Sequence, residues 1–287
     1  MIIPLLKDEA LLEDIRQAGQ ETGHFHLWWL GQSGFLVCWG GRFLLFDPYL
    51  SDSLTRKYAD TEKPHVRMTE RVVDPGLLDF IDVVSSSHNH TDHLDAETLG
   101  PLCAANPELA LVVPSANLPF VAERLGVRED RLHGLEAGEQ LSLEPFTLHA
   151  VPAAHEQLDL DDQGRHPCLG FVATFGSWAI YHSGDTVLYE GIADLLRAFQ
   201  LDLALLPING RSAARDVPGN LWGREAVQLA RQAAISMVIP CHYDMFTFNT
   251  ETPDEFLREA AAHGQAGQVL QSGERFSSHQ LPPRSGP

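Results

Sequence analysis

Three histidines and an aspartate fall within six consecutive residues of this chain, at 88–93, which read His-Asn-His-Thr-Asp-His. The motif directly follows a short apolar run that predicts a buried β-strand. Residues two apart on an extended segment point the same way, so His88 and His90 can bind one metal ion. Asp92 and His93, past the turn, can face a second ion beside it. Because imidazole and carboxylate groups suit zinc, manganese and iron, the motif predicts one or two divalent metal ions at a strand end.

Three further candidate ligands, His155, Asp185 and His242, each follow an apolar segment that predicts a strand. A single histidine in such a place is more often structural than functional. Here all three fall where strand ends and their loops converge on one edge of a two-sheet fold. We therefore expect two ligand sets that share the Asp185 carboxylate: His88, His90 and His155, then Asp92, His93 and His242.

The order of the predicted elements favours an α+β fold, an αββα sandwich. A helix over 5–19 is followed by three short strands within 26–46, and later strands alternate with helices. That order suggests two sheets packed face to face with helices outside. We find no repeat and no internal linker, so we expect one domain over 1–287 with a frayed tail at about 277–287. The polar segment 48–75 is long for a loop and is a candidate substrate lid.

Charge and composition exclude some classes of partner. The formal net charge is −19, whereas nucleic acids and anionic membranes need a basic face, so we expect neither. No apolar run reaches the roughly 18 residues of a membrane helix. The four cysteines lie far apart without a CxxC pair, which fits a reducing cytoplasm. The expected partner is a small, anionic substrate bound through local cations, and the sequence is compatible with a homo-oligomer.

Three residues are candidates for contacting that substrate. His182 precedes the Ser-Gly-Asp turn that carries Asp185, and it either reaches the site or packs in the core. Asn209 and Arg211 follow the predicted strand 203–206, whose end should face the cleft. The forked guanidinium of arginine binds phosphate or carboxylate, so we expect Arg211 to hold an anionic group.

Three charged residues nearer the N-terminus have open interpretations. Asp47, in an Asp-Pro pair after a predicted strand, either accepts a hydrogen bond from a ligand histidine or only forms a turn. Lys57 and Arg67 lie in the long early loop, where they can help to recognise an anion. We interpret each of these two cations as a solvated surface charge.

The motifs together resemble those of the metallo-β-lactamase superfamily, over about 28–249. The resemblance rests on the HxHxDH motif, the later His155, the Asp185 of the Ser-Gly-Asp turn and the final His242. Four segments are also similar to the L-ascorbate-6-phosphate lactonase group: WWLGQSG at 28–34, YHSGD at 181–185, LPINGR at 206–211 and IPCHYDMF at 239–246. That lactonase has Asp where this chain has His155, so neither manganese preference nor the exact substrate carries over directly.

The resemblance implies a metal-dependent, lactonase-like hydrolase. A metal-bound hydroxide would attack a small anionic ester, most specifically a sugar-phosphate lactone, and Asp92 would orient it and pass a proton to the leaving oxygen. The segment 87–95 also resembles phospholipid-directed phosphodiesterases of the same superfamily, so a soluble phosphodiester is one alternative substrate. A non-catalytic metal-binding sensor or scaffold is another alternative. Seven ligand positions together favour an enzyme.

Overall fold

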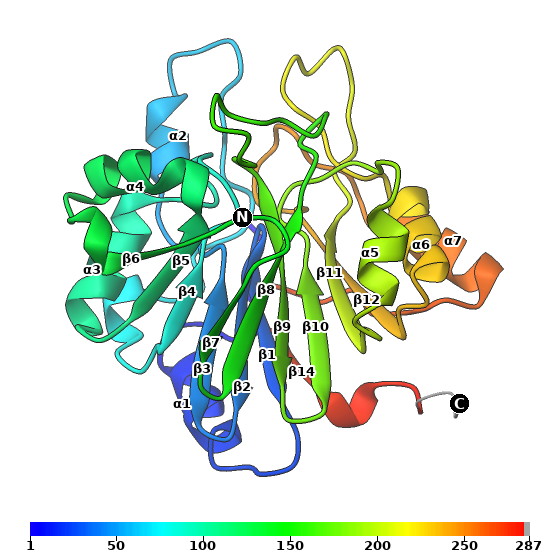
Figure 1. Ribbon diagram of the computed structural model, residues 1–287, viewed down its shortest axis with the longest axis horizontal. Helices are drawn as coiled ribbons and strands as arrows, with labels where there is room; N and C mark the ends of the chain where they lie inside the picture. Colours follow the sequence, from blue (N-terminus) through cyan, green and yellow to red (C-terminus); the bar gives the residue numbers. More distant parts are fainter. Residues whose placement is uncertain (284–287) are drawn as a thin grey trace.

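Two seven-stranded sheets form the centre of the computed structural model, which describes residues 1–283 (Figure 1). The first sheet has the order β14 (Arg275–Ser277), β1 (His26–Gly31), β2 (Gly34–Trp39), β3 (Arg42–Phe46), β4 (Val83–Ser85), β5 (Ala110–Pro114) and β6 (Leu132–Leu135). The second has the order β13 (Ala266–Gly267), β12 (Met237–Cys241), β11 (Leu203–Pro207), β10 (Trp178–His182), β9 (Leu169–Phe175), β8 (Phe146–Pro152) and β7 (Gln140–Leu143). Both sheets mix parallel and antiparallel pairs.

The strands of the first sheet alternate their side chains between two apolar layers. Leu27 and Trp29 of β1 pack between the sheets, whereas Trp28 and Leu30 pack against the helices on the outer face. Those helices are α1 (Asp8–Ala18), α3 (Ala96–Ala105) and α4 (Leu118–Leu125). The second sheet is covered by α5 (Ile192–Arg197), α6 (Gly223–Gln232) and α7 (Asp254–His263), as Figure 1 shows. The layers are therefore helix, sheet, sheet and helix, which confirms the predicted αββα sandwich.

Several boundaries differ from the predicted ones. The first helix begins at Asp8 rather than residue 5, because the Leu5 amide donates to Ser272 O and the Asp8 amide to Val72 O. The segment 48–75 is not irregular throughout, since it contains α2 (Ser53–Lys57). Short 3₁₀ helices also occur at Pro75–Leu77, Ser115–Asn117, Glu129–Arg131 and Ser278–Gln280. None of the helices within 1–283 is long and apolar enough to span a membrane.

β14 and the 3₁₀ helix Ser278–Gln280 occupy part of the tail that was expected to be frayed from about 277. β14 pairs antiparallel with β1. The side chain of its Phe276 is fully buried in the hydrophobic core. The Ser278 amide then donates to Phe25 O. Burial of Phe276 thus orders the chain beyond residue 277, and residues 284–287 lie outside the described part of the chain.

Strand direction decides where the polar loops meet. β3 runs parallel to β4, and β10, β11 and β12 run parallel to one another. β8 runs in the direction of β10, since both pair antiparallel with β9. Figure 1 shows the loops that follow these strands at one edge of the sandwich. The same edge therefore receives every segment that carries a predicted metal ligand.

Candidate metal centre

A tight turn between β4 and α3 folds the HxHxDH motif back on itself. The Leu94 amide donates to His90 O at 2.8 Å, and the Ser86 hydroxyl donates to His93 O at 2.8 Å. The Asp95 carboxylate then accepts from the Glu97 amide and caps α3. This turn places the side chains before and after it around one hollow, whereas the prediction placed His88 and His90 on an extended segment.

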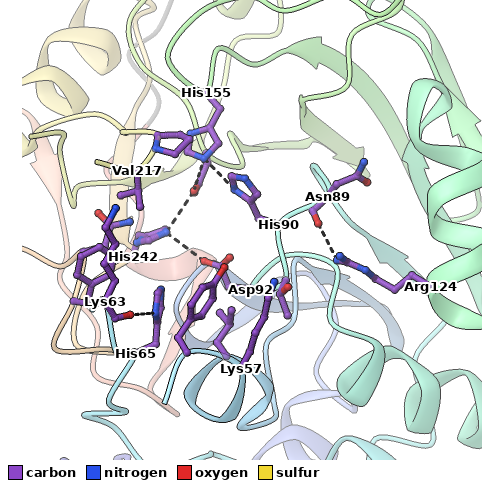
Figure 2. Close-up of a pocket in the computed structure, with 17 residues that line it drawn as sticks. Lys57, Lys63, His65, Asn89, His90, Asp92, Arg124, His155, Val217 and His242 are labelled. Carbon is purple, nitrogen blue, oxygen red and sulfur yellow. Dashed lines mark hydrogen bonds and ion pairs between the residues drawn. The ribbon is translucent and has the colours of Figure 1, made fainter. Parts of the chain in front are cut away.

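The first predicted ligand set comes together in the structure. His88 Nε2 lies 3.0 Å from His90 Nδ1, and His155 Nε2 lies 3.2 Å from the same atom. His155 follows β8, so it reaches the motif from the other sheet. Three imidazole nitrogens thus converge on one point, and Figure 2 shows two of these side chains, His90 and His155.

The second set lies beside the first. Asp92 Oδ2 is 3.5 Å from His93 Nε2 and 3.6 Å from His242 Nε2. Asp185 stands between the two sets: its Oδ1 is 3.4 Å from His93 Nε2, and its Oδ2 is 3.4 Å from His242 Nε2 and 3.6 Å from His155 Nε2. All seven predicted ligands therefore surround one small volume, with the Asp185 carboxylate shared.

These distances fit metal coordination. Ligand atoms about 2.0 Å from a tetrahedral ion lie about 3.3 Å from one another. Among the described residues, the buried His93 Nε2 and Asp185 Oδ1 have no hydrogen-bond partner. Buried polar atoms are seldom left unpaired, and a cation between them would satisfy both. The donor set thus fits one or two divalent ions, and zinc, manganese and iron all accept imidazole with carboxylate.

Burial and neighbouring charges set the protonation of the ligands. Burial, with the adjacent His93, holds the pKa of His88 well below its usual value, so this imidazole is neutral and can donate a lone pair to a metal. Burial also opposes charge on His242, but the Asp185 and Asp92 carboxylates outweigh it and raise the pKa of His242 to about 9. Burial opposes charge on Asp185, but His93 and His242 outweigh it and hold the pKa of Asp185 well below its usual value. Both carboxylates are therefore ionised.

Asp47, at the end of β3, fixes the orientation of one ligand. Its Oδ2 lies 2.6 Å from His93 Nδ1, and its Oδ1 accepts from the Ser87 amide at 2.8 Å. Asp47 is fully buried. Of the two interpretations of Asp47, the structure supports the hydrogen bond to a ligand histidine, which directs His93 Nε2 toward the site.

Gly184 lets the Ser-Gly-Asp turn approach the motif closely. Its φ is +58°, and a Cβ added there would lie 2.5 Å from Ser87 Cβ. A larger residue would push the turn away from the strand end that carries His88. Glycine at this position thus brings Asp185 within reach of the histidines.

Gln32, in the Gly-Gln-Ser-Gly turn between β1 and β2, was missed as a site residue. Its Nε2 donates to Asp92 Oδ2 at 2.8 Å, and its main-chain oxygen accepts from the His242 amide at 3.0 Å. The side chain is buried, so it holds two ligands of the second set in place. The sequence indicated a turn flanked by glycines at this position. That pattern does not predict a function for Gln32.

His182 and Asn209 lie outside the pocket above the ligands. His182 is buried, stacks on Phe46 with ring centroids 5.0 Å apart and contacts Ser33 O through Nε2 at 2.8 Å. Asn209 is fully buried, and its Nδ2 donates to Asn249 Oδ1 at 3.2 Å. Both side chains are packed in the interior, which for His182 is the second of its two interpretations, and Asn249 rather than Asn209 lines the pocket.

Arg211 does not face the metal ligands, contrary to the prediction. Its guanidinium binds both carboxylate oxygens of Glu225, at 2.6 and 2.7 Å, and also donates to Asn220 O. It lines a neighbouring hollow with Glu156 and Asp216. α6 presents Glu225 to the turn after β11, a contact that the local sequence does not reveal, so in this structure Arg211 is paired within the protein.

The pocket above the ligands has a volume of about 310 Å³ (Figure 2). Besides ligands, its wall contains cationic, aromatic and aliphatic side chains: Leu54, Lys57, Tyr58, Lys63, His65, Arg124, Val217, Pro218 and Phe248. Lys57 is thus a pocket residue, whereas Arg67 pairs with Asp52 at 2.6 Å. Sequence reasoning assigned no role to Lys63, His65 or Arg124.

Known proteins share this architecture. A model of the beta-lactamase superfamily domain matches residues 42–243. Two UPF0173 metal-dependent hydrolases are similar in sequence. One, from Caldivirga maquilingensis, is 28% identical over 87% of this chain and 96% of its own length. The other, from Pelotomaculum thermopropionicum, is 29% identical over 85% of this chain and 96% of its own length. A solved metallo hydrolase from Ignicoccus hospitalis has a TM-score of 0.64 at 20% identity, covering 88% of this chain and 98% of its own, and so shares the fold. The chain belongs to the metallo-β-lactamase superfamily.

Proposed function

We propose that the protein is a metal-dependent hydrolase of small anionic esters or lactones. The observation that carries the proposal is the arrangement of seven histidine and aspartate ligands at the floor of a pocket. Similar proteins named metal-dependent hydrolases support the reaction class. The pocket volume of about 310 Å³ suits a small molecule.

Different side chains have different roles in the proposed reaction. Two divalent ions held by the seven ligands would activate a water molecule and polarise the carbonyl under attack. Asp92 lines the pocket, its side chain is 16% exposed, and Gln32 holds one of its oxygens. Its carboxylate is therefore placed to take a proton from the attacking water and deliver it to the leaving oxygen. Asp47 keeps His93 in the tautomer that its ligand role needs.

A sugar-phosphate lactone is the specific substrate that we propose to test first. The similarity of the segments 206–211 and 239–246 to the ascorbate-phosphate lactonase group supports this choice. The cationic residues of the pocket wall are consistent with a phosphate-bearing substrate. A soluble phosphodiester is the alternative that the assay must compare.

The test is a turnover assay of metal-loaded protein with sugar-phosphate lactones, uncharged lactones and phosphodiesters. We expect hydrolysis of the charged lactones, and Asp185→Asn should lower kcat/KM by at least about a hundredfold, because it keeps the shape but removes the charge between the ions. Asp194→Asn, at an exposed position of α5, is the matched control. Turnover of phosphodiesters alone would select the alternative substrate. No turnover of any substrate by fully metal-loaded protein would favour a sensor or scaffold.

A further inference from the structure

Two cations in the pocket wall, Lys57 and Arg124, form no salt bridge with a carboxylate of the residues within 1–283. We propose that they form a subsite for a compact oxyanion group, a phosphate or carboxylate, that the substrate carries away from the bond under attack. The proposal deepens the proposed function and rests on it, because it names the group by which the hydrolase recognises its substrate.

The charges of the pocket differ from those of the whole chain. The protein has 39 acidic and 20 basic residues, of which only three are lysines. Two of these lysines, Lys57 and Lys63, line this one pocket together with Arg124. Among the described residues that line it, the only carboxylates are Asp92 and Asp185, which belong to the metal ligands. Above the metal ligands, the described wall therefore carries positive charge alone, in a protein whose general field repels anions.

Contacts with the protein fix Arg124 beside the metal loop. Its Nη1 donates to Asn89 O at 2.8 Å and to Leu94 O at 3.0 Å, and its guanidinium lies 4.3 Å from the centre of the Phe120 ring. Both carbonyls belong to the loop that carries His90. Nε and Nη2 donate to no described residue, so one edge of the guanidinium stays available for an oxyanion.

Lys57 and Lys63 differ in what they contact. Lys63 Nζ is 2.9 Å from Asp216 Oδ2, and this carboxylate neutralises it. Lys57, at the end of α2, has its Nζ 5.1 Å from the centre of the Tyr58 ring and pairs with no described carboxylate. Figure 2 shows Arg124 on the side of the pocket opposite to Lys63 and His65. The unpaired charge therefore belongs to Lys57 and Arg124.

The rest of the wall restricts the substrate further. Tyr58 stacks on His65 with ring centroids 4.5 Å apart, and Phe248 lies 5.1 Å from the same imidazole. Burial lowers the pKa of His65, so this ring adds no charge at neutral pH. We expect an ester or lactone with an apolar or sugar face for these rings and an oxyanion for the two cations. Binding at a distance from the scissile bond would position that bond over the metal ligands.

The test measures anion binding without turnover. Metal-loaded protein is titrated with inorganic phosphate, and in a separate arm with acetate, at an ionic strength held constant with sodium chloride, and the rise in Tm gives an apparent Kd. Lys57→Gln and Arg124→Gln should each raise that Kd at least about tenfold for the oxyanion that the subsite accepts. Lys7→Gln and Arg211→Gln remove cations outside the pocket and should leave it unchanged. Arg124→Lys keeps the charge and a donor for the two carbonyls, and should bind with intermediate affinity.

The outcomes separate this inference from the proposed hydrolysis. Equal affinity in the native protein, Lys57→Gln and Arg124→Gln would place the anion on the metal ions alone and overturn the subsite. Loss of affinity in Lys57→Gln with none in Lys7→Gln supports it, whether or not any ester is hydrolysed. A protein that binds phosphate through Lys57 but turns over no substrate would keep the subsite and refute the hydrolase.

Discussion

At the scale of single residues, the site depends on side chains that orient the ligands as much as on the ligands. Asp47 is fully buried, and its two oxygens contact His93 and the Ser87 amide. Ser87 in turn precedes His88. The Asp47 carboxylate therefore connects the end of β3 to both ends of the HxHxDH motif. It binds His93 through Nδ1, which leaves Nε2 facing the metal position.

Asp47→Asn should weaken metal binding by about 10- to 100-fold, because the amide cannot replace both carboxylate contacts that direct His93 Nε2 into the site. The measurement is competition for zinc with a chromophoric chelator. Asp60→Asn, at an exposed position of the early loop, is the matched control. Equal zinc affinity in Asp47→Asn and the native protein would contradict the orienting role.

The ligands were predictable from sequence, and the pocket wall was not. Histidines and aspartates two to three residues apart after a strand give a local pattern, and strand direction then brings the later ligands to the same edge. Arg124 gave no such signal, because its contacts are with Asn89 and Leu94, 35 and 30 residues away. Arg211 had a plausible local position, but its partner Glu225 was visible only after folding.

At the scale of elements, the C-terminal strand is part of the sandwich. β14 pairs with β1 through Leu27 and Phe276, and Phe276 is fully buried in the cluster between the sheets. Its ring centroid lies 6.3 Å from that of Phe25. The three residues of β14 thus form the edge strand of the first sheet. They lie beside β1, the strand that leads to Gln32.

Phe276→Ala should lower the free energy of unfolding by about 3–5 kcal/mol, because it leaves a cavity at a fully buried aromatic site. Urea-induced unfolding of the metal-loaded protein measures the change. Leu257→Ala, at a position that is 45% exposed, should cost less than about 1 kcal/mol. Near-equal stability of Phe276→Ala and the native protein would mean that β14 contributes little to the fold.

The strands that sequence reasoning missed are short, and β6 and β7 among them are half-exposed. β7 alternates exposed and partly buried residues in the sequence Gln-Leu-Ser-Leu, and β6 contains a glycine. Neither has the apolar run by which β4, β11 and β12 were predicted. β14 was missed because its three residues lie in a polar stretch, and only pairing with β1 makes them a strand.

At the scale of the whole molecule, an acidic protein has a pocket with a cationic wall. The chain has a net charge of −19, yet its metal-ligand pocket has a wall with Lys57, Lys63 and Arg124. Ligands from both sheets meet at this pocket, since His88 follows β4 of one sheet and His155, Asp185 and His242 follow strands of the other. The site therefore exists only when the two sheets are packed.

Metal content per chain tests this account most directly. Protein loaded with zinc or manganese and freed of excess metal should hold one or two ions by elemental analysis. His88→Ala/His90→Ala should hold at least one ion fewer, because it removes two of the three ligands of the first set. His133→Ala/His279→Ala, at exposed positions outside the pocket, should keep the native content. Native metal content in the His88→Ala/His90→Ala protein would contradict the assignment of the site.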